Sequence, residues 1–415
     1  MKRGILIALL LSFGPAVSNS FARFAYALLL PSMRSELAMS YAQAGWLNTA
    51  NAIGYLIGAL VTRALVNRVG NRVLFIAGMW LTAIAVGATG LASDIGLLSF
   101  WRLLAGACGA AVFICGGALS GNIFPDKPAL GTTTIAVYFA GGGIGLALCG
   151  AAIPLLLQAQ GPSSWPMAWQ AMAIVALLMS LATQWAANRI EEPSLVSASG
   201  ATDAIAHATG AAIATGAANA TVAATVATTV STPIAPLLPE LLAYVCFGLG
   251  YIGYMTFVVA WMNANGAGLW SVIATWVVLG LATIAAPVVW RAPLAQWSGG
   301  RPMTLIMIVL ASGAVLPLVS TNFGMMILSA SLFGLGMFSV PSAVSSLIKR
   351  QLPKPAWGSM MASFTIAFAA GQIVGPVFAG WLADWQGSLA PGLAVSAAVL
   401  LLGAAIASRQ RDLDG

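Results

Sequence analysis

The chain has 415 residues, of which 60% are hydrophobic and only 7% are charged, with a formal net charge of +7. A soluble domain uses roughly 25% charged residues, so this composition cannot build a water-facing surface and excludes a soluble enzyme. Since one bilayer-spanning helix needs about 20 mostly apolar residues, the apolar content suffices for about twelve spans.

The first apolar run extends from residue 4 to about residue 31. Its basic start is typical of a signal peptide, but the run is longer than a signal core of about 7 to 15 residues, so we predict a transmembrane helix. Hydropathy predicts eleven further spans, near 42–62, 73–92, 96–120, 129–157, 167–187, 237–262, 269–290, 303–320, 323–348, 358–383 and 389–408.

A stretch rich in Ala, Thr, Ser and Gly, residues 191–236, separates the first six spans from the last six. Residues 211–230 are weakly apolar, but a thirteenth span there would put the C-terminal arginines on the wrong side of the membrane. We therefore predict an N-terminal six-helix bundle in residues 1–190, a cytoplasmic low-complexity linker in 191–236, and a C-terminal six-helix bundle in 237–415.

The positions of the lysines and arginines predict the orientation. With the N-terminus in the cytoplasm, every cation near a span end except Arg34 lies on the cytoplasmic side, where such residues are retained. The sequence thus predicts a multi-pass protein of the bacterial inner (plasma) membrane with both termini cytoplasmic. The positive net charge is then a signal of topology and not of nucleic-acid binding.

Two short loops with glycine and arginine occupy equivalent places in the two halves. The loop between spans 2 and 3 contains Asn67, Arg68, Gly70 and Arg72, and the loop between spans 8 and 9 contains Gly300 and Arg301. Such an internal repeat fits two parallel six-helix units with a binding cavity between them.

On these residues the chain resembles the major facilitator superfamily of secondary transporters. Arg68, Gly70 and Arg72 match the family's loop pattern, whereas Asn67 stands where the family has an aspartate that serves as a charged latch. Arg102 with Gly106 is similar to the family's Arg-x-x-x-Gly pattern, and Phe-Ala-Arg-Phe-Ala-Tyr at 21–26 looks like the YbfB/YjiJ branch. The resemblance implies an all-α membrane protein with twelve transmembrane helices in two six-helix bundles around a central cavity, gated at these loops.

Two ionisable side chains lie inside predicted spans, Arg23 in span 1 and Arg102 in span 4. A charge in the bilayer costs about 2.5 to 3.5 kcal/mol, so each is a candidate functional residue. Both lie at similar depth, about 12 and 9 Å from the outer ends of their spans, and the resemblance implies that spans 1 and 4 line the cavity. Two guanidiniums without an acidic partner suit a carboxylate or phosphate, which predicts an anionic substrate. The alternative is that the arginines only brace helices.

Further polar side chains extend the predicted substrate-binding set. Asn19 and Tyr26 stand four residues before and three residues after Arg23, which places all three on one face of an α-helix. Isolated polar groups in other spans complete the set: Asn51, Tyr138, Tyr251 and Gln372. Interhelical hydrogen bonds would explain these four without any ligand.

The sequence predicts a monomeric secondary active transporter that moves a small metabolite, an organic anion, by alternating access. It contains no Ser-His-Asp set and no phosphate-binding loop, which argues against an enzyme or an ATP-driven pump. The four cysteines lie in apolar runs and the only histidine, His207, lies in the linker, so we expect no metal and no cofactor.

If H+ is the coupling ion, the substrate's own carboxyl group or an acidic residue at a span end must carry it, the candidates being Glu36, Asp94, Asp126 and Glu240. Uniport and anion exchange are the other modes of transport. A non-transporting receptor or scaffold and a lipid flippase are the alternative functions for the fold.

Overall fold

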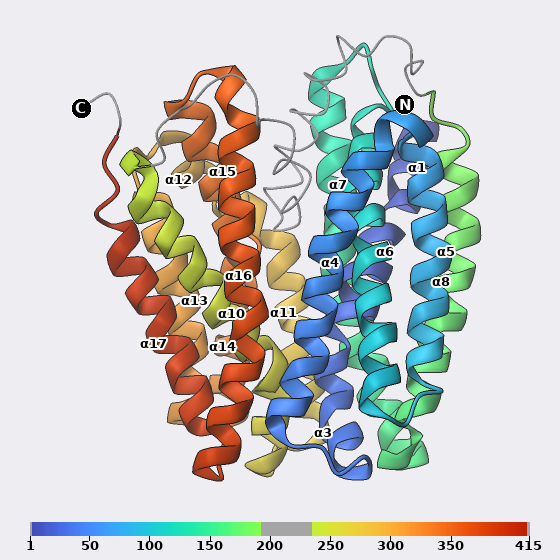
Figure 1. The fold of residues 1–415 in the computed structure, drawn as a ribbon, viewed down its shortest axis with the longest axis vertical. Coiled ribbons are helices and arrows are strands. Elements are labelled where there is room, and N and C mark those ends of the chain that lie inside the picture. Colours follow the sequence, from blue (N-terminus) through green and yellow to red (C-terminus); the bar gives the residue numbers. More distant parts are fainter. Residues whose placement is uncertain (1, 192–234, 413–415) are drawn as a thin grey trace.

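The computed structural model describes residues 2–191 and 235–412, and all regular structure within these residues is helical. Twelve helical segments among them are long and apolar enough to cross a membrane. The twelve predicted spans are therefore confirmed, and the chain is a multi-pass membrane protein. The start of the first helix and the end of the last lie at the same end of the molecule (Figure 1). The predicted linker, including His207, falls outside the described residues except at its two ends.

The first six spans form one group of helices, on the right in Figure 1. Span 1 consists of four consecutive segments, α1 (Lys2–Leu11), α2 (Phe13–Pro15), the π-helix η1 (Ala16–Phe24) and α3 (Tyr26–Glu36). The others are α4 (Tyr41–Val69), α5 (Asn71–Thr89), α6 (Ile95–Gly121), α7 (Pro128–Gln160) and α8 (Trp165–Ala187), the last preceded by the 3-10 turn η2 (Pro162–Ser164).

The last six spans form the second group, on the left in the same view. The 3-10 turn η3 (Ala235–Leu237) leads into α10 (Leu238–Ala264), and α11 (Leu269–Val289) is followed by the short α12 (Arg291–Gln296). The remaining helices are α13 (Arg301–Val319), α14 (Phe323–Met337), α15 (Val340–Gln351), α16 (Lys354–Gln386) and α17 (Ala390–Ala407), of which α14 and α15 together make span 10.

The most extensive contacts between the two groups are made by three helix pairs, α4 with α16, α7 with α11, and α3 with α10. Glycine permits the closest of these contacts. A Cβ added at Gly45 would lie 2.2 Å from the carbonyl oxygen of Pro376, and one at Gly380 would lie 2.2 Å from that of Tyr41. The α4 and α16 backbones therefore touch at the end of the molecule opposite the termini.

A carboxylate strengthens this contact. Asp384, near the end of α16, accepts hydrogen bonds from the backbone N–H groups of Tyr41 and Ala42, both at 2.8 Å. These are the first two residues of α4, whose N–H groups have no partner within their own helix. An anion at a helix N-terminus is also favoured by the helix dipole. Asp384 thus caps a helix of the other half, and we call this contact the outer latch.

The π-helix in span 1 departs from the α-helical geometry expected from the sequence. Its ladder ends with the N–H of Ala25 donating to the carbonyl of Ser20, five residues earlier, at 2.7 Å. The spacing that placed Asn19, Arg23 and Tyr26 on one face assumes 3.6 residues per turn, so that face does not form as expected. π-helical turns are frequent at functional sites.

The two glycine-containing loops differ in detail. In the first loop, Gly70 follows α4 directly and has a φ of 86°. In the second loop, Gly300 directly precedes α13 and has a φ of −82°, and the glycine with a positive φ is Gly299. Asn67 and Arg68 are exposed, as is Arg301. Arg72 donates to the carbonyl of Ile190, at the end of the first half.

Candidate substrate site

Arg23 lies within the π-helix of span 1 and is only 6% exposed. Its Nε and Nη2 atoms are buried and have no hydrogen-bond partner. The guanidinium carbon lies 5.7 Å from the ring centre of Phe24 and 5.8 Å from that of Tyr55, close enough for cation–π attraction. A buried guanidinium with two unpartnered donors is costly, which makes it the strongest candidate ligand-binding group in the described chain.

Arg102 binds the protein through its two terminal nitrogens, whereas its Nε is buried without a hydrogen-bond partner. Its Nη1 donates to the carbonyl of Ala22, and its Nη2 donates to the carbonyl of Arg23 at 3.4 Å. The guanidinium also lies 4.9 Å from the ring centre of Tyr26 and 5.6 Å from that of Trp169. Both arginines are buried at the same stretch of span 1. Arg102 braces the π-helix through its terminal nitrogens, so the edge with two unpartnered donors belongs to Arg23.

Most of the other predicted polar groups in the first half also bind protein. Tyr26 donates through its hydroxyl to the carbonyl of Ala44 at 2.8 Å, and Asn51 donates to the carbonyl of Arg102 at 3.0 Å. Tyr138 donates to the carbonyl of Val112 at 2.8 Å. Asn19 is buried at 5% exposure. These contacts join spans 1, 2, 4 and 5 to one another.

The second half contributes Tyr251 from α10 and Gln372 from α16. The Gln372 amide donates to the Tyr251 hydroxyl at 2.5 Å, and both residues are buried. The ring centre of Phe24, the residue after Arg23, lies 6.1 Å from that of Phe338 in the second half. Arg23 thus lies where the two six-helix groups meet, the usual position of a binding site in a transporter built from repeats.

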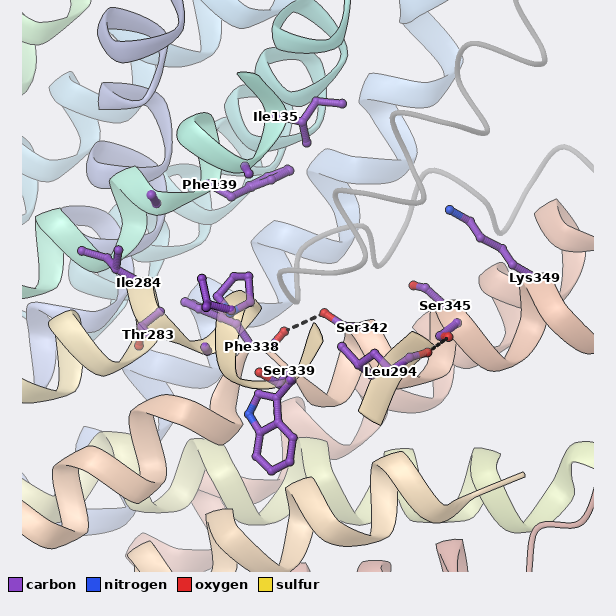
Figure 2. A pocket seen from close by; sticks show the side chains of 17 residues that line it. Ile135, Phe139, Thr283, Ile284, Leu294, Phe338, Ser339, Ser342, Ser345 and Lys349 are labelled. Carbon is purple, nitrogen blue, oxygen red and sulfur yellow. Dashed lines mark hydrogen bonds between the residues drawn. The ribbon is translucent and has the colours of Figure 1, made fainter. Parts of the chain in front are cut away.

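A cavity of about 550 Å³ is lined by α7 from the first half and by α11 and α15 from the second. Of these helices, α15 lies towards the end of the molecule that carries the termini (Figure 1). Figure 2 shows Ile135 and Phe139 of α7 on one side and Ser342, Ser345 and Lys349 of α15 on the other, with α11 contributing Thr283 and Ile284. The volume is in the range that small-molecule sites occupy.

Two phenylalanines connect this cavity to Arg23. Phe338 lines the cavity, and its ring centre lies 6.1 Å from that of Phe24. Phe24 in turn is the ring next to the Arg23 guanidinium. The pair, one ring from each half, therefore stands between the cavity and the buried cation. We call it the aromatic pair.

The aromatic pair and the outer latch are features that the sequence did not point to. Hydropathy treats a phenylalanine in a span as an ordinary apolar residue, and Asp384 is one of several acidic residues at span ends. Among residues 2–191 and 235–412 there is no cluster of three or more His, Cys, Asp or Glu side chains that could hold a metal ion.

Twelve helices in two groups of six, with a buried cation where the groups meet, define a secondary transporter of the major facilitator type. The chain belongs to the family described as "Uncharacterised MFS-type transporter YbfB", which matches residues 16–215 and 204–408. Family and fold both point to a transporter rather than to an enzyme.

Comparison with solved structures supports the fold. A crystal structure of a mutant of the nucleoside transporter NupG superimposes with a TM-score of 0.69, covering 96% of this chain and 99% of that chain at 10% sequence identity. At this identity the likeness concerns the fold alone. No curated protein matches the sequence.

Proposed function

We propose that the protein transports a small organic anion across the bacterial inner membrane by alternating access, with Arg23 as the residue that binds the anionic group. The observation that carries this proposal is the pair of buried, unpartnered donors on Arg23, at the contact between the two halves. Nε and Nη2 lie on one edge of the planar guanidinium, and two parallel N–H donors on one edge match the two oxygens of a carboxylate.

The distribution of cations supports a cytoplasmic location for both termini. On that assignment the cavity of about 550 Å³ faces the cytoplasm and the outer latch faces the other side. The described conformation is then inward-facing, with Arg23 separated from the cavity by the aromatic pair. Opening of the latch and closure of the cavity would expose the same site to the outside.

Uptake into proteoliposomes tests the proposal. Radiolabelled organic anions, neutral sugars and organic cations are compared for the wild type, Arg23→Gln and Arg34→Gln. The last variant removes a cation from the same span, but one that stacks on Tyr41, 3.7 Å from its ring centre, near the outer end. We expect anion uptake that is lost in Arg23→Gln and kept in Arg34→Gln.

Uptake of only neutral or cationic compounds, or anion uptake unchanged in Arg23→Gln, would refute the assignment. The same vesicles also test H+ coupling, because a proton symporter accumulates anion only when a pH gradient is imposed. Binding without any flux would favour a receptor on the same fold.

A further inference from the structure

Resting on the proposed function, we infer that the substrate is a monocarboxylate with an apolar body, such as an alkanoate or an arylalkanoate, rather than a dicarboxylate or a sugar acid. Three features of the described residues support this inference: the number of cationic groups available to a ligand, the hydrogen bonds that neighbouring polar side chains already make, and the apolar lining of the cavity.

The site offers one cationic edge. Arg102 is adjacent, but its two terminal nitrogens donate to main-chain carbonyls of span 1. Among the described residues that line the cavity, the one cation is Lys349, ten residues beyond Ser339 on the same side of the cavity. Ten residues of α-helix correspond to about 15 Å, so a small molecule held by Arg23 cannot place a second acidic group on Lys349. The charge count favours a single carboxylate, with Lys349 attracting it at the entrance.

Three of the polar side chains predicted for the site are already paired. The hydroxyl of Tyr26, the amide of Asn51 and the amide of Gln372 each donate to a protein acceptor. A substrate with many hydroxyl groups would lose its hydrogen bonds to water on entering and would find few replacements. A buried polar group without a partner is strongly disfavoured, so the site selects against sugars and sugar acids.

The hydroxyl groups of the cavity are paired in the same way. Ser339, Ser345 and Thr283 donate to carbonyls of their own helices at 2.8, 3.0 and 2.9 Å, and Ser346 donates to the carbonyl of Leu294 at 2.7 Å. The surface that remains is largely apolar, with contributions from Ile135, Phe139, Ile284, Pro287 and Phe338. The serines that line the cavity therefore add little hydrogen-bonding capacity for a ligand, and the lining is mainly hydrocarbon.

These features define the pose. The carboxylate binds the Nε and Nη2 edge of Arg23, where the rings of Phe24 and Tyr55 flank the guanidinium. The apolar body extends past the aromatic pair towards the cavity. Every part of such a molecule meets a matching group, whereas a second charge or a polyol would not.

The test compares matched acids and alcohols on the full-length protein in lipid nanodiscs by isothermal titration calorimetry. The probes are butanoate, hexanoate and octanoate, the corresponding alkanols, 3-phenylpropanoate and 3-phenylpropanol, succinate and gluconate. We expect the alkanoates and 3-phenylpropanoate to bind, with Kd falling roughly fourfold for each added methylene group, and the alcohols to bind at least tenfold more weakly. Arg23→Gln should abolish the difference between acid and alcohol, and Arg23→Lys should keep part of it.

The outcomes separate the two claims. Arg23-dependent binding of succinate or gluconate in preference to the alkanoates overturns the substrate class while leaving anion binding at Arg23 intact. A Kd that does not change with chain length overturns the apolar body. Alcohols that bind as tightly as acids, or acid binding unchanged in Arg23→Gln, overturn the role of Arg23 itself. If Arg23→Gln does not fold, the acid and alcohol series on the wild type still decides the question, and the absence of any binding refutes the inference.

Discussion

Removal of the outer latch is expected to shift the protein away from the conformation described here. Asp384 accepts two backbone N–H groups of α4, each at 2.8 Å, across the contact between the halves. Asp384 is exposed and the two donating residues are half-buried, so each bond is comparable to an ordinary helix cap, worth about 1 kcal/mol. Asp384→Ala therefore removes about 2 kcal/mol, a factor of about 30 in the ratio of the two conformations. Asp384→Asn keeps one acceptor and should shift the ratio about fivefold.

Double electron–electron resonance measures that ratio directly. Spin labels at Ser163, in the 3-10 turn η2 of the first half, and at Thr321, in the loop between α13 and α14 of the second half, report the separation at the latch end in a background whose four native cysteines are alanine. The matched control is Asp94→Ala. Asp94 caps α6 by accepting the N–H of Leu97 at 2.9 Å, but it does so within one half.

We expect the population with the longer outer distance to grow in the order wild type, Asp384→Asn, Asp384→Ala, with no change in Asp94→Ala. The reasoning fails if Asp384→Ala and Asp94→Ala give the same distance distribution as the wild type. It fails equally if both variants open the outer side, because the effect would then come from the loss of any cap and not from the contact between halves.

Three further predictions concern other contacts. Arg102→Lys loses the two-pronged contact with span 1 and leaves at least one carbonyl unsatisfied, so thermal unfolding should show a loss of stability of about 1 to 3 kcal/mol. The control is Arg189→Lys, at an exposed arginine that stacks on Trp185, which should change stability by less than about 0.5 kcal/mol. Equal effects of the two substitutions would contradict the bracing role. Phe338→Ala removes one ring of the aromatic pair and should accelerate the modification of Arg23 by phenylglyoxal, measured by peptide mass spectrometry. Phe139→Ala also enlarges the cavity, but the Phe139 ring lies against Phe113, so this control should not change the rate. An unchanged rate in Phe338→Ala would show that the pair does not shield Arg23. The Gly299 N–H donates to Asp412 and holds the pKa of that carboxyl below its usual range. This contact is therefore fully present above the usual aspartate value of about 3.9 and is lost as pH falls through the lowered pKa. Protection of the Gly299 amide from hydrogen exchange, corrected for intrinsic rates, should fall over that acidic range and should be absent throughout in Asp412→Ala, which has no acceptor; protection that persists in that variant would contradict the assignment.

The number of spans and their approximate limits were predictable from the sequence. Each span is a long apolar run, and the penalty for an unpaired backbone group in lipid leaves the helix as the one structure that such a run can adopt. The predicted span at 42–62, for example, corresponds to α4 (Tyr41–Val69), which continues beyond the apolar segment to Gly70. The limits differ where a helix extends past its hydrophobic part.

The details of the site were less predictable, because they depend on contacts between spans. The π-helix follows no hydropathy signal, and its displaced carbonyls are satisfied by Arg102 from a helix about 80 residues away in sequence. The burial of Arg23 and Arg102 was expected from the cost of a charge in lipid. Which of the two stays open was not, since both have the same chemistry and a similar depth.

The roles of the single polar residues were open for the same reason. Tyr138 and Gln372 each had two interpretations in the sequence, as a substrate contact or as a hydrogen bond between helices. The structure places Tyr138 on a carbonyl of the same half and Gln372 on Tyr251. Only the positions of the acceptors, which no periodicity encodes, distinguish one interpretation from the other.

Because Arg102 donates to main-chain oxygens, its hydrogen bonds to span 1 do not depend on which side chains residues 22 and 23 carry. Any amino acid at position 23 would present the same carbonyl to the same guanidinium. Under the role that we propose for Arg23, its backbone carbonyl serves the scaffold and its side chain serves recognition, so the two lie on different chemical groups of one residue. A substitution at this one position would then change the charge that the site recognises and leave the Arg102 contacts in place.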